Sequence, residues 1–202
     1  MAQVIVKAYA SPGCVLLAFD WPEGENHADF LGFAISRDPG YGKDGKPQFL
    51  FNKLDFRPLT ATSKPKESDQ APIQKFNWWD GGIDPADRGR QFTYTVTPVL
   101  GPDPEHLQLR TQAAGQLTVT VPQALQGKIA TYFNRAVVSS QSFTRLKNAG
   151  ASLEKQMDWL ANGLQEAVPD ILKQSGAFDC AIYHLDKLSC NFTKCEAFVC
   201  KP

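Results

Sequence analysis

Large apolar residues alternate with small polar ones in two segments of the first 121 residues. In 92–99 the sequence reads Phe-Thr-Tyr-Thr-Val-Thr-Pro-Val, and 115–121 repeats the alternation. A period of two is typical of a strand with one face buried and one face in solvent. Apolar runs of strand length, separated by turn residues such as Ser11-Pro12-Gly13, predict further strands at 4–9, 14–19, 30–37 and 49–52.

This series of short strands contains no helical pattern, which favours two antiparallel sheets packed face to face. We therefore expect residues 3–121 to form a sandwich of the immunoglobulin or fibronectin type III kind, in a mainly β protein with C-terminal helices. Tyr94, early in the penultimate strand, fits the position of a tyrosine-corner residue in such folds.

The pattern changes after Pro122. Residues 139–147 predict a helix, and Ser152 can cap a second one with an apolar stripe that Pro169 should kink or divide. Residues 180–185 read as one short strand. We expect a helical segment with this strand over 122–185 and an irregular tail over 186–202. The stripe comprises Leu153, Met157, Leu160, Leu164, Val168, Ile171 and Leu172.

Charge and composition exclude some functions. The 202 residues contain 21 Lys plus Arg and 21 Asp plus Glu, so no overall field attracts nucleic acid or anionic lipid. No apolar run is long enough for a membrane span, and the N-terminus reads as a strand rather than a signal peptide. We expect a cytoplasmic protein with reduced cysteines.

Five segments stand out along the chain: 72–80, 94–101, 132–143, 159–164 and 181–185. Taken in this order, they resemble the N-terminal region of bacterial phospholipase D-like proteins. The resemblance covers about residues 3–186 and implies that residues 180–185 form the first strand of a catalytic domain. Beyond Leu185 the likeness stops, and the tail looks foreign or truncated.

Proteins of this kind carry their chemistry in two His-x-Lys-x-x-x-x-Asp motifs, in which one histidine attacks phosphorus and the other protonates the leaving alcohol. His27, His106 and His184 all lack the required lysine two residues later. We therefore expect no catalytic residue here. The chain would be a non-catalytic scaffolding or targeting portion of a phospholipase D-like phosphodiesterase. The alternative is a stand-alone module that binds a protein or carbohydrate partner.

Trp78 and Trp79 are the candidate ligand-binding residues. An exposed aromatic pair can form a platform for a sugar, a base or a peptide. Neighbours in an extended segment point to opposite faces, so at most one of the two should touch a ligand. The alternative, which we favour, is that one tryptophan packs in the core and the other covers its edge.

Four cysteines could supply zinc ligands: Cys190, Cys195 and Cys200, which are separated by four residues each, and Cys180, ten positions earlier. Four intervening residues are at the edge of the range for a zinc knuckle, and their repetition is unusual. We expect free thiols, with no metal and no cofactor.

The helix and the strand at the C-terminus would leave apolar surface and backbone groups uncovered. We expect them either to fold back onto the sandwich or to pair two chains as a homodimer, and we favour the dimer.

Overall fold

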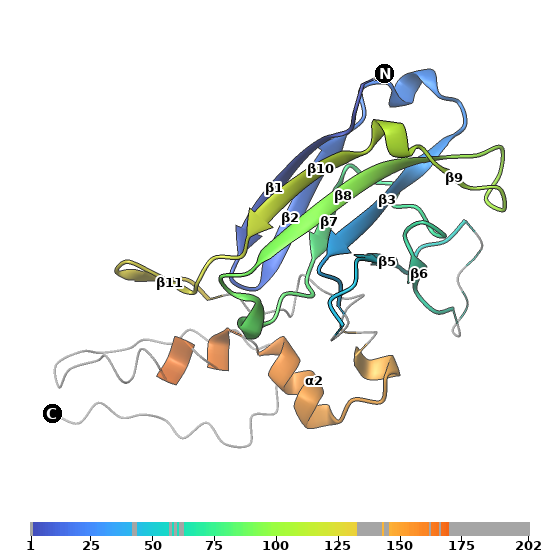
Figure 1. Ribbon diagram of the computed structural model, residues 1–202. Helices are drawn as coiled ribbons and strands as arrows, with labels where there is room; N and C mark the ends of the chain where they lie inside the picture. The colour runs from blue at the N-terminus through green and yellow to red at the C-terminus, as the bar shows by residue number, and fades with distance from the viewer. Residues whose placement is uncertain are drawn as a thin grey trace, which may run out of the picture.

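Two antiparallel sheets make up the body of the computed structural model, which describes residues 2–41, 44–56, 58, 60, 63–132, 143, 146–161, 163–165 and 167–169 (Figure 1). The first sheet has the order β1 (Ile5–Ser11), β2 (Cys14–Asp20), β7 (Asn77–Asp80). The second has the order β10 (Gly115–Thr120), β8 (Gln91–Leu100), β3 (Phe30–Asp38), β4 (Gln48–Phe49), and β9 (Gln108–Leu109) pairs with β8.

One hydrophobic core lies between the two sheets. Along β2 the side chains alternate between buried and partly exposed, and Val15, Leu17 and Phe19 are the buried ones. They share a core with Phe33 of β3 and Tyr94 of β8. Each such side chain stabilises the fold by about 1.5–3 kcal/mol when fully buried. The prediction of a mainly β protein with antiparallel sheets is confirmed.

The chain start ties the two sheets together along one edge. The Val4 amide donates to the Ala113 carbonyl at 2.8 Å, so the segment before β1 runs beside the turn that leads into β10. A Cβ atom on Gly115 would overlap the Val4 carbonyl oxygen and lie 2.8 Å from the Val4 carbonyl carbon. Glycine is required here because two backbones approach more closely than any side chain allows.

Short elements lie beside β3. β5 (Phe51–Asn52) pairs with β6 (Lys66–Glu67), and the backbone of Ile73 bonds in both directions to that of Phe33. The segment after β6 therefore covers the start of β3 before the chain enters β7. Among the described residues, single 3₁₀ turns lie at Gly24–Asn26, Pro85–Asp87 and Thr111–Ala113.

After the second sheet the chain forms a small hairpin, β11 (Leu125–Gln126) with β12 (Ile129–Ala130), and then the helix α2 (Leu153–Leu160). Ser152 caps α2 as predicted, because its side chain accepts a hydrogen bond from the Lys155 amide. No residue of α2 is buried.

The helix is interrupted earlier than at Pro169, where the sequence predicted a kink or division. α2 ends at Leu160, well before Pro169, because a turn with Gly163 at φ +92° interrupts it, and helical residues resume only at Leu164. A φ of this sign suits glycine and does not belong to a right-handed helix.

Other C-terminal predictions stay open. Most of the helix predicted over 139–147, the strand at 180–185, the tail and its four cysteines all lie outside the described residues. The homodimer through the helix and strand therefore stays a prediction. Within the described part of the chain, no helix is long and apolar enough to cross a membrane.

A fragment ending at Gln123 should unfold cooperatively, with a thermal midpoint close to that of the whole chain. All members of the core cluster lie between Val4 and Val121, and Val121 itself is held by backbone bonds to Gly89 and Arg90. Circular dichroism during heating measures this. A fragment that melts without a cooperative transition would show that the core depends on the residues after Gln123.

Candidate functional site

The tryptophan pair lies on β7, at the edge of the three-stranded sheet. Trp78 is opposite Leu17 of β2, whose side chain is fully buried, and it packs against the core. Trp79 is opposite Leu16, and its side chain points to the outer face, where it is 46% exposed. The two tryptophans thus lie on opposite faces, as strand alternation predicts. Whether either one binds a ligand stays a prediction.

Trp79 belongs to a row of apolar side chains that crosses the outer face of this sheet. Tyr9 of β1 is opposite Leu16 of β2, and Leu16 is opposite Trp79 of β7. Directly opposed residues of antiparallel strands carry their side chains on the same face. Tyr9 is 61% exposed, more than Trp79. We call Tyr9, Leu16 and Trp79 the aromatic row.

The neighbouring row on the same face is smaller and more polar. Lys7 is opposite Ala18, and Ala18 is opposite Asn77. Lys7 and Asn77 are exposed, whereas the short side chain of Ala18 leaves room between them. Hydrogen-bonding groups therefore lie beside the aromatic row at both of its ends.

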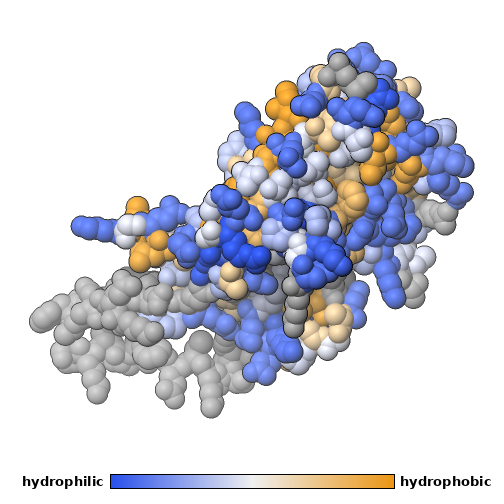
Figure 2. Space-filling view, viewed as in Figure 1, coloured by the Kyte–Doolittle hydropathy of each residue, from blue (hydrophilic) through white to orange (hydrophobic). Residues whose placement is uncertain are grey.

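The outer face of the five-stranded sheet is different in chemistry. It carries threonine and glutamine, and the Thr93 and Thr118 hydroxyl oxygens are 2.8 Å apart across β8 and β10. The Gln116 amide donates to the Thr95 hydroxyl at 3.0 Å. Figure 2 shows a mostly pale and blue surface over these strands, as expected of a solvated face. Its polar groups bond to each other, so we regard it as the solvent side.

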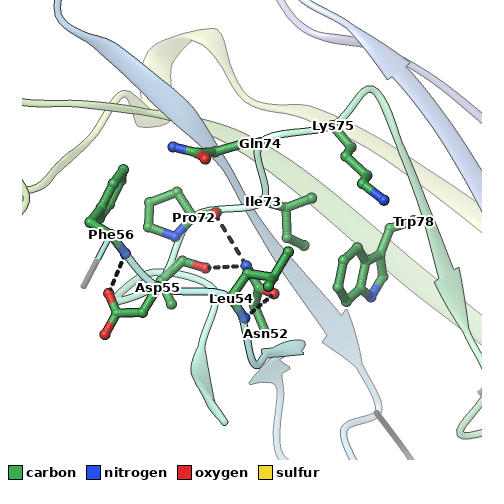
Figure 3. A pocket seen from close by; sticks show the side chains of 10 residues that line it. Asn52, Leu54, Asp55, Phe56, Pro72, Ile73, Gln74, Lys75 and Trp78 are labelled. Carbon is green, nitrogen blue, oxygen red and sulfur yellow. Dashed lines mark hydrogen bonds between the residues drawn. The ribbon is translucent and has the colours of Figure 1, made fainter. Parts of the chain in front are cut away.

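A small cavity opens beside the inward-facing tryptophan, between β7 and the loop that follows β5 (Figure 3). Its volume is about 200 Å³, below the range in which drug-sized ligands are usually held. Its buried amide, that of Asn52, already donates to the carbonyls of Ala71 and Pro72 and accepts from the Leu54 amide. These bonds hold the loop in place, so the cavity is a weaker candidate than the aromatic row.

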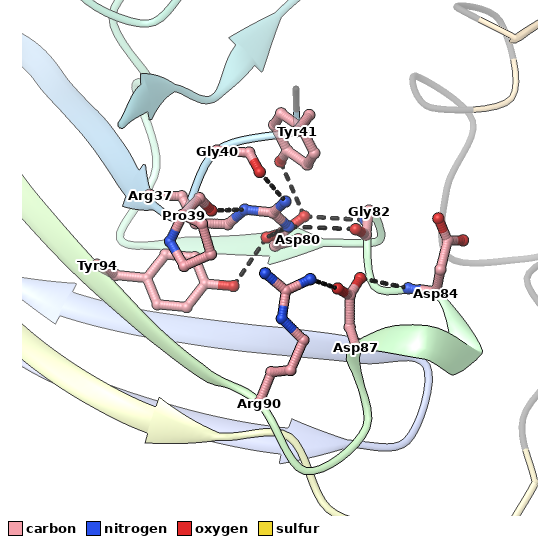
Figure 4. A network of polar contacts seen from close by, with 10 residues as sticks. All are labelled: Arg37, Pro39, Gly40, Tyr41, Asp80, Gly82, Asp84, Asp87, Arg90 and Tyr94. Carbon is pink, nitrogen blue, oxygen red and sulfur yellow. Dashed lines mark hydrogen bonds and ion pairs between the residues drawn. The ribbon is translucent and has the colours of Figure 1, made fainter. Parts of the chain in front are cut away.

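A buried carboxylate, that of Asp80, is the centre of the most extensive polar network (Figure 4). Its Oδ2 accepts from Arg37 Nη1 at 2.9 Å and from the Tyr94 hydroxyl at 2.8 Å. Its Oδ1 accepts from the Tyr41 hydroxyl at 2.8 Å and from the Gly82 amide at 2.9 Å. Four donors thus satisfy the Asp80 carboxylate. Tyr94 is not a tyrosine-corner residue, because its hydroxyl donates to a side chain and not to nearby backbone.

The Arg37 guanidinium is satisfied equally well. It lies over the Tyr41 ring, 3.8 Å from its centre, and 4.8 Å from the centre of the Phe92 ring. Only 3% of Arg37 is exposed. The group donates its remaining hydrogen bonds to backbone carbonyls, those of Pro39, Gly40 and Gly82.

Arg37 and Tyr94 keep their protonation states near neutral pH. Burial alone would lower the pKa of Arg37, but the Asp80 charge and the two phenols outweigh it, and that pKa is raised. Burial, followed by the Asp80 charge, raises the pKa of Tyr94. Neither group changes protonation in the neutral range, so the network is suited to holding the fold together and not to proton transfer.

The two described histidines lie in separate local contacts. His27 stacks on Trp21, with ring centres 4.9 Å apart, and His106 Nδ1 is 2.8 Å from Asp103 Oδ1. Within the described residues, neither histidine is hydrogen-bonded to a serine, threonine or cysteine, and no three His, Cys, Asp or Glu side chains gather as metal ligands would.

The Asp69 carboxyl is partly buried and only partly hydrogen-bonded. Its Oδ1 is buried without a hydrogen-bond partner among the described residues. Burial, together with the nearby Glu67 charge, raises the pKa of this carboxyl. A carboxyl with a raised pKa binds its proton more tightly in the folded state, so the stability it contributes is lost as pH rises through that pKa.

Asp69→Asn should therefore raise the thermal midpoint at pH 7 by a few degrees, because the amide carries no charge to bury. The gain should disappear at acid pH, below about 3, where the carboxyl is protonated in both the folded and the unfolded state. Differential scanning fluorimetry across pH measures it, with Asp20→Asn, on the exposed end of β2, as the matched control. An equal gain at every pH would exclude the ionisation as its cause.

Comparisons with known proteins do not assign this chain to a family. No known protein family and no curated protein matches the sequence. Among solved structures, pectate lyase PelI from Erwinia chrysanthemi, in complex with tetragalacturonic acid, is similar over 58% of this chain and 28% of its own, with 8% identity and a TM-score of 0.31. Pectate lyase Pel3 from Pectobacterium carotovorum is similar over 65% of this chain and 30% of its own, with 8% identity and a TM-score of 0.32. The chain thus matches less than a third of the length of either enzyme.

Proposed function

We propose that this chain is a non-catalytic recognition module whose binding surface is the outer face of the β1-β2-β7 sheet. The observation that carries the proposal is the aromatic row, in which Tyr9 and Trp79 are exposed on either side of Leu16. Exposed aromatic rings aligned on a rigid sheet are costly to leave in water and are typical of binding surfaces.

The strand arrangement supports a fibronectin type III-like sandwich as the scaffold of this module. A three-stranded sheet in the order β1-β2-β7 faces a second sheet in the order β10-β8-β3-β4, with a shared core. Sandwich domains of this kind present rigid faces and loops to partners. The fold by itself does not specify a function, so the proposal depends on the surface.

We further propose that the module acts as an accessory part of a phospholipase D-like phosphodiesterase. The support is the sequence resemblance, which includes the residues of β7 and most of β8 among its segments. In such an arrangement the aromatic row would bring the catalytic domain to a surface or polymer, and the module itself would perform no chemistry.

A comparison of ligand classes tests the recognition role. Thermal midpoints of the wild-type protein and of Trp79→Ala are measured with neutral saccharides, peptides, nucleotides and phospholipid vesicles. A ligand that stabilises the wild type but not the variant supports the proposal. Stabilisation by no class of ligand, or equal stabilisation of both proteins, contradicts it.

Hydrolysis of a generic nitrophenyl phosphodiester tests the non-catalytic part. We expect no turnover above that of buffer. Turnover that persists through repurification and is abolished by His27→Ala or His106→Ala would overturn this part of the proposal.

A further inference from the structure

We infer that the aromatic row binds a neutral, linear saccharide, an inference that rests on the recognition role proposed above. The observations that carry it are the spacing of the rings, the polar groups beside them, the small area of the row and the low charge of the face.

The spacing of the row matches a chain of sugar rings. Neighbouring strands lie about 4.8 Å apart, so Tyr9 and Trp79, separated by β2, are about 10 Å apart. Each ring of an extended saccharide is about as wide as one strand spacing. Three consecutive rings therefore cover Tyr9, Leu16 and Trp79, and the outer two can stack their C–H faces on the aromatic side chains.

The neighbouring row supplies the polar contacts that a sugar requires. Lys7 and Asn77 are exposed and lie next to Tyr9 and Trp79 on their strands, while Ala18 between them keeps the surface low. An ammonium group and an amide can donate to ring hydroxyls, and the amide can also accept. Stacking with hydrogen bonds at both ends is the chemistry by which a flat, polyhydroxylated ring is held.

The apolar area of this face is too small for a stable protein partner. At 61% and 46% exposure, Tyr9 and Trp79 together present about 200 Å² of surface, and Ile5, 55% exposed on the same face of β1, adds about 100 Å². A standard protein interface buries about 800 Å² on each partner. A second copy of this chain, or another folded protein, would have to cover much of the polar surroundings as well, whereas three sugar rings fit the row itself.

The charge of the face excludes a strongly anionic ligand. On the outward positions of β1, β2 and β7 the only Lys, Arg, Asp or Glu side chains are Lys7 and Asp20. Binding of a nucleic acid strand depends on a positively charged groove along its backbone, which is absent from this face. Because the charges of Lys7 and Asp20 cancel, this face has no net charge and suits an uncharged ligand.

Titration calorimetry with mannohexaose, cellohexaose and xylohexaose tests the inference on the full chain. We expect at least one of them to bind with a dissociation constant below millimolar. Trp79→Ala and Tyr9→Ala should each weaken that binding by about tenfold, the effect of losing one stacking platform. Trp79→Phe should retain part of it, which keeps the test valid if the alanine variant folds poorly.

Two controls test the position of the site and the preference for an uncharged ligand. Thr118→Ala, on the outer face of the other sheet, should bind as the wild type does. Hexamannuronate, which has the mannohexaose backbone with a carboxylate on each ring, should bind more weakly. No binding by the three neutral sugars at millimolar concentration, or tighter binding of hexamannuronate, overturns the inference. If none of the neutral sugars binds but a peptide or a vesicle binds through Trp79, the saccharide inference fails while the recognition role stands.

Discussion

Asp80→Asn should destabilise the protein by about 3–5 kcal/mol, the usual effect of removing one partner from a buried ion pair. The variant leaves the Arg37 guanidinium buried with no counter-charge. It also replaces one acceptor oxygen with an amide NH₂ group, which faces donors in either orientation. At the Oδ1 position it would face the Tyr41 hydroxyl and the Gly82 amide, and at the Oδ2 position the Arg37 guanidinium and the Tyr94 hydroxyl. Since small domains are stable by only about 5–15 kcal/mol, this is a large part of the total.

Urea unfolding followed by tryptophan fluorescence measures the loss. Tyr94→Phe is the matched comparison, because it removes a single hydrogen bond to the same carboxylate and should cost about 1–2 kcal/mol. The double variant Arg37→Met, Asp80→Leu should lose less than the sum of its two single changes, since it leaves no isolated charge. If the unfolding free energy of Asp80→Asn lay within about 1 kcal/mol of the wild-type value, the ion pair would contribute little to stability.

Gly115→Ala should cost about 3 kcal/mol or more, although it adds only one methyl group. The new Cβ atom would meet the Val4 carbonyl, which is backbone and cannot rotate away. The strand start must then move, and the Val4 bond to Ala113 and the burial of the Val4 side chain are lost together.

The same unfolding measurement tests this prediction, with Gln116→Ala as its neighbour on β10. Gln116 is exposed and donates one hydrogen bond to Thr95, so Gln116→Ala should lower the unfolding free energy much less than Gly115→Ala does. If both variants were equally stable, the close approach of the two backbones would not be needed for the fold.

Strand periodicity predicted most of the body of the molecule. The alternation over 92–99 and 115–121 corresponds to β8 and β10, and the apolar runs correspond to β1, β2 and β3 within one or two residues. The run at 49–52 is divided in the structure, because the Leu50 amide donates to the Ile35 carbonyl between two short strands. Periodicity is local, so it finds strands well and interruptions within them poorly.

The partners of the buried network could not be predicted in the same way. Arg37 and Asp80 are 43 positions apart, and no local pattern marks either as buried. Tyr94 was noticed, but its hydroxyl bonds to Asp80, because the strand pairing brings a carboxylate within reach.

The sequence analysis named one of the two aromatic residues of the candidate site and missed the other. The sequence identified Trp79 but gave no reason to group it with Tyr9, which is 70 positions earlier. Only the pairing of β1 with β2, and of β2 with β7, aligns the two rings on one face. Side-chain alternation is visible in a sequence, whereas the register between strands depends on the whole sheet.

A map of amide chemical shifts tests the central claim most directly. Isotope-labelled protein is titrated with the saccharide that binds in calorimetry. We predict shifts concentrated around Tyr9, Leu16 and Trp79, with those of Thr93 and Thr118 on the opposite face unchanged. Shifts confined to the β8 and β10 face, or to the cavity around Asn52, would contradict the account.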